Sequence, residues 1–221
     1  MCFSAEASFI GAAVLVTIGT LTLKKLSQRN QLLLALIPFI FALQQLAEGF
    51  LWLTTDSLED YAHYGPFLRN SFLFIAVLIW PVWMPLSFFV AETKQSNQIW
   101  LAALVTGGLL YDLVVVYGML FWWSFDSIWL EVFNHSIQYH LPLAEDYHYY
   151  TTSYYLLTIL PTFFSSLKGT WISGILNLIG FAIAFSFFYV ALVSVWCFFA
   201  AWVSLWVYVV ISLNGSEKAN A

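Results

Sequence analysis

Hydrophobic residues fill seven long stretches of the chain, separated by short polar segments. The stretches cover residues 8–23, 31–53, 70–91, 99–121, 151–167, 171–189 and 191–212. Each is long enough, or nearly so, for a helix that crosses about 30 Å of hydrocarbon. The last two belong to one apolar run, which we divide near Tyr189 because a single helix of that length would measure about 60 Å. The pattern predicts seven transmembrane helices.

The second stretch, 31–53, carries polar residues where a membrane helix should be apolar. Gln44, Gln45 and Glu48 lie in its middle, followed by Trp52. At 100° per residue, Gln44, Glu48 and Trp52 form one ridge, with Gln45 on its flank. Amides and carboxylates persist inside a bilayer only where they face protein or a wet cavity and have a partner. We expect this helix to form the wall of an internal site.

The composition indicates one class of protein. Of the 221 residues, 62% are hydrophobic and 9% are charged, whereas soluble domains carry roughly 25% charged residues. The chain also lacks a polar segment long enough for a separate soluble domain. We expect an all-α integral membrane protein, with a single transmembrane domain over residues 1–221, a lipid bilayer around it and no nucleic acid partner.

The basic residues predict the orientation, because Lys and Arg accumulate on cytoplasmic loops. Seven helices with the N-terminus outside and the C-terminus in the cytoplasm place all basic residues but Arg69 inside. These are Lys24, Lys25, Arg29, Lys94, Lys168 and Lys218. The acids on the outer side would be Glu6, Asp56, Glu59, Asp60, Asp126, Glu131, Glu145 and Asp146.

The outer segment 122–150 has a pattern of its own. Apolar residues between Ile128 and Ile137 fall on one helical face, and Glu131, with the polar residues near it, falls on another. This spacing predicts a short interfacial helix that lies on the membrane or folds over the bundle. As a lid it would cover the outer end of the ridge that holds Glu48. A solvated loop is the alternative.

Four histidines could supply metal ligands on the outer side. They are His63, His135, His140 and His148. His135 and His140, with acids nearby, could bind zinc or another divalent cation, although a gap of five places them off a common helical face. Ordinary loop histidines are the alternative. With a metal, the chain would be a membrane-embedded hydrolase that uses metal-bound water and Glu48 as base.

A second acid lies inside a predicted helix. Asp112 is near the middle of 99–121, where a bare carboxylate costs about 2.5–3.5 kcal/mol on insertion scales. We expect it to be protonated or paired, with Tyr111, Tyr117 or the glutamines of 31–53 as partners. Both a proton-coupled role and a neutral structural role fit this position.

Six sequence motifs resemble a known family. They are MCFSAEASF at the start, FALQQLAEGFLWL, WPVWMP at 80–85, the run HSIQY at 135–139, Pro161 with Ser165 and Ser166, and SVWCFFAA at 194–201. Together they resemble a family of bacterial membrane proteins known as a domain of unknown function that opens with Met-Cys-Phe-Ser. The resemblance implies a multi-helix protein of the bacterial inner membrane and supplies no catalytic residue.

The pattern as a whole favours a polar pocket that opens outward and binds or transports a small molecule or lipid. Its candidate residues are Gln44, Gln45, Glu48, Trp52, Arg69, Asp112, His135 and Tyr139. The segments VLIWPVW at 77–83 and LVSVWCF at 192–198 are similar, as the two halves of a transporter with an internal repeat would be. The similarity is too short to establish a repeat. The alternatives are the metal-dependent hydrolase and an accessory subunit of a larger membrane complex. A homo-oligomer is also open.

The two cysteines, Cys2 and Cys197, are candidates for a disulfide. With the N-terminus outside, both lie toward the oxidising side of an inner membrane, where disulfides persist. A tail folded into the outer mouth of the bundle would bring them together if their Cα atoms came within about 7 Å. The alternative is a buried apolar thiol at Cys197 and a frayed terminus at Cys2. Both cysteines lie in motifs of the family resemblance, which favours the bridge.

Overall fold

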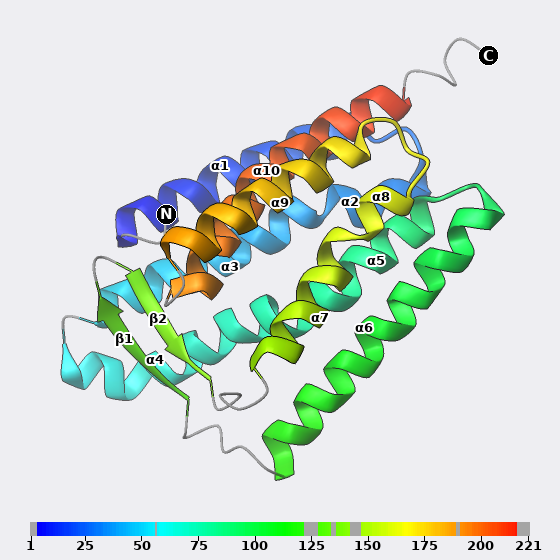
Figure 1. Ribbon diagram of the computed structural model, residues 1–221. Coiled ribbons are helices and arrows are strands. Elements are labelled where there is room, and N and C mark those ends of the chain that lie inside the picture. The colour runs from blue at the N-terminus through cyan, green and yellow to red at the C-terminus, as the bar shows by residue number, and fades with distance from the viewer. Residues whose placement is uncertain are drawn as a thin grey trace.

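The chain forms an elongated bundle of helices with a small β-hairpin at one end (Figure 1). The computed structural model describes residues 4–55, 57–121, 128–133, 136–141, 147–188 and 191–215. The first half contains α1 (Ala5–Lys25), η1 (Arg29–Gln31), α2 (Leu32–Ala35), α3 (Ile37–Thr54), α4 (Leu58–Leu73), η2 (Phe74–Ile79), α5 (Trp80–Ala91) and α6 (Gln95–Phe121). The second half contains β1 (Trp129–Phe133), β2 (Ser136–His140), α7 (Tyr147–Ile159), α8 (Pro161–Phe164), α9 (Thr170–Phe187) and α10 (Leu192–Gly215).

Six helical segments in the described part of the chain are long and apolar enough to cross a membrane. They are Ala5–Lys25, Arg29–Thr54, Glu59–Ala91, Gln95–Phe121, Thr170–Phe187 and Leu192–Gly215. Each contains or closely matches one of the predicted stretches, and the division of the last apolar run into two helices is confirmed. The chain is therefore a helical membrane protein.

The predicted helix 151–167 is the one that the six segments do not include. Its residues form α7 and α8, which meet at a turn at Leu160. Pro161 begins α8, and because proline lacks a backbone N–H and crowds the preceding turn, it kinks a helix at this point. Polar residues in the first turns of α7, such as Thr151 and Ser153, lower its hydropathy further.

The third helix begins earlier than its apolar pattern indicates. We expected a helix from residue 70, but α4 begins at Leu58 and continues through η2 and α5 to Ala91. Ser57 caps α4, because its hydroxyl accepts a hydrogen bond from the Asp60 N–H at 3.2 Å. The first turns carry acids and a histidine, which is why hydropathy alone misses them. The segment η2 is a π-helix, a rare form that appears mostly as short insertions in α-helices.

The predicted interfacial helix in 122–150 is wrong, because this segment contains a β-hairpin. Strand β1 pairs antiparallel with β2, with Trp129 opposite His140 and Phe133 opposite Ser136. Both runs are rich in β-branched and aromatic residues, and two residues, Asn134 and His135, separate them in the sequence. That arrangement is a hairpin signal, and it outweighs the helical spacing of the apolar residues.

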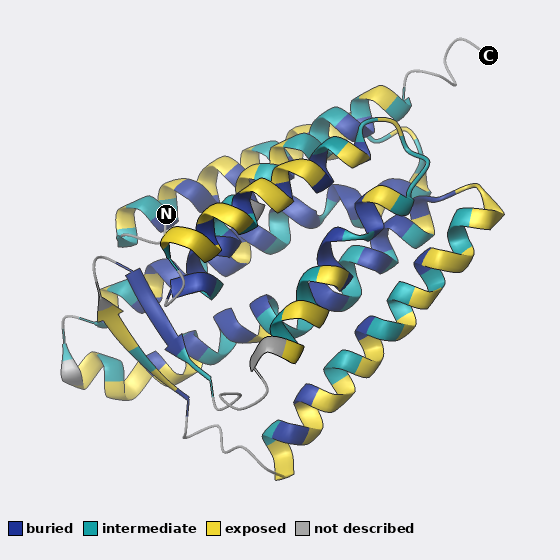
Figure 2. Ribbon diagram, viewed as in Figure 1, coloured by how far each residue is buried: buried dark blue, intermediate teal, exposed yellow. Residues whose placement is uncertain are grey.

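The hairpin packs against the bundle through β2. In Figure 2, β2 is mostly dark blue, which marks buried residues, and β1 is mostly yellow, which marks exposed residues. The Tyr139 ring stacks on Phe72 of α4 with centroids 4.7 Å apart, and Ile137 is fully buried. Arg69 of α4 donates a hydrogen bond to the Ile128 carbonyl just before β1. The hairpin thus occupies the covering position that we expected of a helix.

Two apolar clusters fill the bundle along its length. The cluster near the hairpin includes Leu51, Phe72 and Trp196, and the cluster toward the other end includes Leu34, Trp80 and Leu101. Figure 2 shows α6 as the helix with much of its surface exposed. Its backbone lies close to that of α5 at Gly108. A Cβ at this position would collide with the Pro81 carbonyl.

Candidate functional site

The polar ridge of α3 lies inside the protein. Gln44, Gln45 and Glu48 each have 0% of their surface exposed. Helix α1 packs on one side of α3, where Phe9 lies so close to Gly49 that a Cβ there would approach its ring to 2.9 Å. Helix α10 packs on another side. This packing differs from the open pocket that we expected, since the three side chains are closed off from solvent.

Gln44 is held by a tryptophan from α5. The indole Nε1 of Trp80 donates a hydrogen bond to Gln44 Oε1 at 2.9 Å, and the indole stacks on Phe41 with centroids 4.0 Å apart. Gln44 Nε2 has no hydrogen-bond partner among the described residues, although the side chain lies near the Cys197 thiol. The hydrogen bond from Trp80 therefore fixes the Gln44 oxygen, while the amide N–H donors of Gln44 have no acceptor among the described residues.

Glu48 is held by a serine from α10. The Ser194 hydroxyl donates a hydrogen bond to Glu48 Oε1 at 2.5 Å. Glu48 thus faces the protein interior, with Ser194 as its hydrogen-bond partner. Arg69, another candidate pocket residue, donates to the Ile128 carbonyl and, at 3.1 Å, to Asn70 Oδ1.

Several polar atoms around Glu48 are left without hydrogen bonds to the described residues. They are Glu48 Oε2, both side-chain polar atoms of Gln45, Gln44 Nε2 and Trp52 Nε1. A buried polar group without a partner costs about 1–3 kcal/mol. We call Gln44, Gln45, Glu48 and Ser194 the polar cluster. Its free donors and acceptors suit a small molecule that offers both kinds of group.

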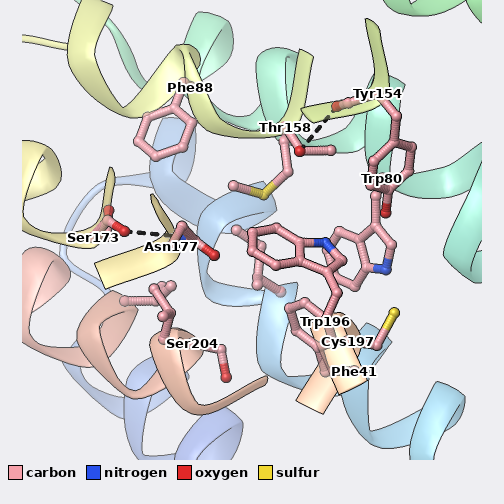
Figure 3. A pocket seen from close by; sticks show the side chains of 14 residues that line it. Phe41, Trp80, Phe88, Tyr154, Thr158, Ser173, Asn177, Trp196, Cys197 and Ser204 are labelled. Carbon is pink, nitrogen blue, oxygen red and sulfur yellow. Dashed lines mark hydrogen bonds between the residues drawn. The ribbon is translucent and has the colours of Figure 1, made fainter. Parts of the chain in front are cut away.

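Two small cavities lie beside the polar cluster. The first, of about 50 Å³, is bordered by Trp80, Trp196 and Cys197, with Asn177 and Ser204 among its polar lining residues (Figure 3). The second has a volume of about 60 Å³ and shares Trp196 and Cys197 with the first. Each is large enough for a few water molecules. None of the residues of the polar cluster lines either cavity, although Gln44 is bonded to Trp80, which borders the first.

Asp112 lies apart from the polar cluster, on α6. Its side chain is partly buried, and its Oδ1 has no hydrogen-bond partner in the described part of the chain. The ring of Tyr111 lines the second cavity, and Tyr111 lies close enough to interact with Asp112. Tyr117 is 53% exposed and packs on Phe121. Tyr111 is the expected partner that interacts electrostatically with Asp112, and the pairing of Asp112 remains a prediction.

Of the predicted metal ligands, His140 lies on β2 of the hairpin. His140 stacks flat on Trp129 at 3.6 Å and is 3.8 Å from a carboxylate oxygen of Glu131. His135 lies outside the described residues. Within the described residues, no three His, Cys, Asp or Glu side chains are grouped as a metal site. The zinc site remains a prediction.

Cys197 is buried, with 1% of its surface exposed, and no disulfide joins it to another described residue. It lies near Gln44 and Glu48, so the polar cluster extends to its sulfur. Cys2 lies outside the described residues, and the disulfide remains a prediction.

The sequence analysis missed a second buried carboxylate, Glu92, at the opposite end of the bundle from the hairpin. Glu92 Oε1 accepts hydrogen bonds from the Thr93 N–H at 2.9 Å, the Lys94 N–H at 2.8 Å and the Ser166 hydroxyl at 2.5 Å. Glu92 Oε2 accepts from the Ser166 N–H at 2.6 Å. Burial disfavours the charge, but these bonds outweigh it and hold the pKa of Glu92 below its usual range.

Further hydrogen bonds join the loops around Glu92. Asn214 of α10 accepts from the Lys168 N–H at 3.0 Å and donates to the Lys168 carbonyl at 3.2 Å. Gln28 donates to the Asn214 carbonyl at 3.2 Å, and Trp206 donates to the Gly169 carbonyl at 2.7 Å. This end of the bundle is tied together by bonds that satisfy most of its polar groups. The sequence offered one signal, an acid among the basic residues of a predicted cytoplasmic loop.

Comparisons with known proteins place the chain in a family. No curated protein and no solved structure matches it. A family model matches over residues 1–221, as the six motifs indicated. The chain belongs to DUF6629, a family of unknown function.

Proposed function

We propose that this membrane protein binds a small polar molecule, or the polar end of a lipid-like molecule, inside its helical bundle, with Glu48 as the anchor. The observation that carries the proposal is Glu48 Oε2, a fully buried carboxylate oxygen without a partner among the described residues. Such a group inside a membrane protein is expensive and marks substrate or ion pathways. A guest that donates a hydrogen bond to this oxygen would remove the cost.

The neighbours of Glu48 define the chemistry of the guest. Gln44 Nε2 and Gln45 Nε2 can donate, whereas Gln45 Oε1 and Glu48 Oε2 can accept. A guest with both donor and acceptor groups, such as a hydroxyl, amide or amine, fits this set. Because the cluster is fully buried, the structure corresponds to a closed form, and binding requires helices or the hairpin to move.

The proposal includes seven crossings, with the N-terminus outside the cell. The kinked pair α7 and α8 runs along the bundle like the longer helices, and the two chain ends lie at opposite ends of the bundle (Figure 1). Lys25, Arg29, Lys94 and Lys168 follow or precede helices at the end away from the hairpin. The positive-inside rule makes that end cytoplasmic, in the plasma membrane of a bacterium. The hairpin and Arg69 then lie outside.

Molecules that copurify with the protein test the proposal. We expect organic extracts of the wild-type protein, analysed by mass spectrometry, to contain a species that Glu48→Gln loses, because the amide cannot accept at both positions. Glu6→Gln is the matched control, since Glu6 is an exposed carboxylate on α1. Identical extracts from the wild type and both variants would contradict a ligand at Glu48.

A further inference from the structure

A wide apolar groove opens on the side of the bundle between η2 and α6. Its volume is about 930 Å³, and α3 contributes Ile40 and Leu43 to its lining. Asn70 and Ser71, close to the hairpin, are its polar lining residues. The groove therefore has a polar end near the outer surface and an apolar body within the membrane-spanning helices.

The π-helix η2 forms one wall of this groove. Five of its six residues line it, and they are Phe74, Ile75, Val77, Leu78 and Ile79. The sixth, Ala76, is buried and lines the second cavity. π-Helical turns often occur at functional sites, because the widened turn re-aims side chains that a regular helix would align. Here it separates a groove outside from a cavity inside.

The groove and the two cavities share walls. Val77 and Leu141 line both the groove and the second cavity. That cavity shares Trp196 and Cys197 with the first cavity, and Cys197 lies close to Gln44 of the polar cluster. The groove, the two cavities and the polar cluster thus follow one another through shared or neighbouring residues.

The dimensions favour a lipid chain as the occupant. From Phe67 to Ile79 the groove runs along thirteen residues of helix, a rise of about 18 Å. One leaflet of the hydrocarbon core is about 15 Å deep. A partner helix is about 10 Å across with its side chains. An extended acyl chain is narrower and matches the depth of one leaflet.

From these observations we propose that the groove binds the acyl chain of a lipid-like amphiphile from the leaflet at the hairpin end. This proposal rests on the proposed function, and it assigns the ligand of the Glu48 site to the class of lipid-like amphiphiles. The ligand is an amphiphile that enters sideways from the bilayer, with its chain in the groove and its polar end directed inward past Val77 and Leu141. Asn70 and Ser71 lie where the polar end first meets the protein.

A photoreactive lipid tests the groove directly. The protein is placed in nanodiscs containing phosphatidylcholine with a diazirine in one acyl chain, irradiated and digested. We expect the labelled peptides to concentrate in 67–83 and 115–120. Val116→Trp should lower this labelling by about tenfold, which corresponds to about 1.4 kcal/mol of binding. Val116 lines the groove and is 39% exposed.

Val114→Trp is the matched control. Val114 lies on the same helix and is 50% exposed, and it is not among the residues that line the groove. Leu120→Trp, also in the groove, replaces Val116→Trp if that variant does not fold. If the label in the wild-type protein is spread evenly over exposed residues such as Ile10 and Leu109, that result by itself overturns the proposal and indicates ordinary boundary lipid.

Glu48→Gln in the same nanodiscs separates the two proposals. The chain site does not include Glu48, so the groove labelling should persist in this variant. Loss of the copurified species with intact labelling supports both proposals. Intact labelling with no copurified species in any protein would leave the groove standing and refute the Glu48 site. Even labelling with a species lost in Glu48→Gln would refute the groove alone.

Discussion

Glu48 and Glu92 are both buried carboxylates, at 0% and 3% exposure, and their surroundings are opposite in kind. Glu92 accepts four hydrogen bonds, at both of its oxygens. Glu48 accepts one well-formed hydrogen bond, from Ser194, and Gln45 lies close enough to interact with its carboxyl group, whose second oxygen has no hydrogen-bond partner among the described residues. The structural carboxylate, Glu92, has hydrogen bonds at both oxygens. Glu48 has one oxygen that can still accept a hydrogen bond from a ligand.

The two sites also differ in what they join. Glu92 links the loop after α5 to Ser166 in the loop after α8, through backbone N–H groups that have fixed positions. Glu48 links the middle of α3 to the start of α10 through one hydroxyl. Four bonds resist movement, whereas one bond is easily exchanged. The contact at Glu92 is therefore expected to be the harder of the two to break.

The largest expected effect is that of Glu92→Ala. The substitution leaves three backbone N–H groups and one hydroxyl without their acceptor, and breaking a buried charged group from one side costs about 3–5 kcal/mol. We expect the free energy of unfolding in detergent micelles to fall by this amount. Glu59→Ala, at an exposed acid in α4, is the control and should change it by less than about 0.5 kcal/mol. Equal stability of the two variants would remove Glu92 from its structural role.

Acid should weaken the same site. The folded-state pKa of Glu92 lies below its unfolded value, so its contribution is fully present above the unfolded pKa, about 4.3, and is lost as pH falls through the folded pKa. We expect the melting temperature to fall below about pH 4 and Glu92→Gln to flatten this part of the curve. Parallel curves for the wild type and the variant would show that other groups control the acid response.

A smaller effect is expected at the indole that holds Gln44. Trp80→Phe keeps a ring to stack on Phe41 but removes the donor to Gln44 Oε1, leaving a buried acceptor unpaired. We expect a loss of about 1–2 kcal/mol in the free energy of unfolding. Trp100→Phe, at a residue that is 60% exposed, is the matched control and should have little effect. Similar losses in both variants would mean that ring size, and not the hydrogen bond, matters.

Hydropathy predicted most of the helices, because the apolar stretches in a membrane protein are long and their ends are polar. It failed where local chemistry competes with that rule. Acids such as Glu59 and Asp60 hid the first turns of α4, although they suit a helix N-terminus. The spacing of apolar residues in 128–137 fits a helix, and pairing between two short strands decided against it.

Only the burial of Glu48, and not the identity of its neighbours, could be predicted from the sequence. A carboxylate inside an apolar stretch identifies Glu48 as buried, whatever the fold. Its partner Ser194 lies 146 positions away and its other neighbour, Cys197, still further, and no local pattern connects such residues. Glu92 is separated from Ser166 by 74 positions, and its place in a basic loop does not identify that partner. Contacts of this kind arise from packing, which one sequence does not reveal.

The smallest effect on stability is expected for Glu48→Gln, and it decides the comparison. Glutamine keeps one oxygen to accept from Ser194 and replaces the unpartnered oxygen by an amide, so the free energy of unfolding should stay within about 1 kcal/mol of the wild type. Glu92→Gln should cost about 2–3 kcal/mol, because glutamine cannot accept at both positions. Denaturation of both variants in the same detergent measures the difference. If Glu48→Gln is as costly as Glu92→Gln, Glu48 holds the fold together, and its free oxygen is not reserved for a guest.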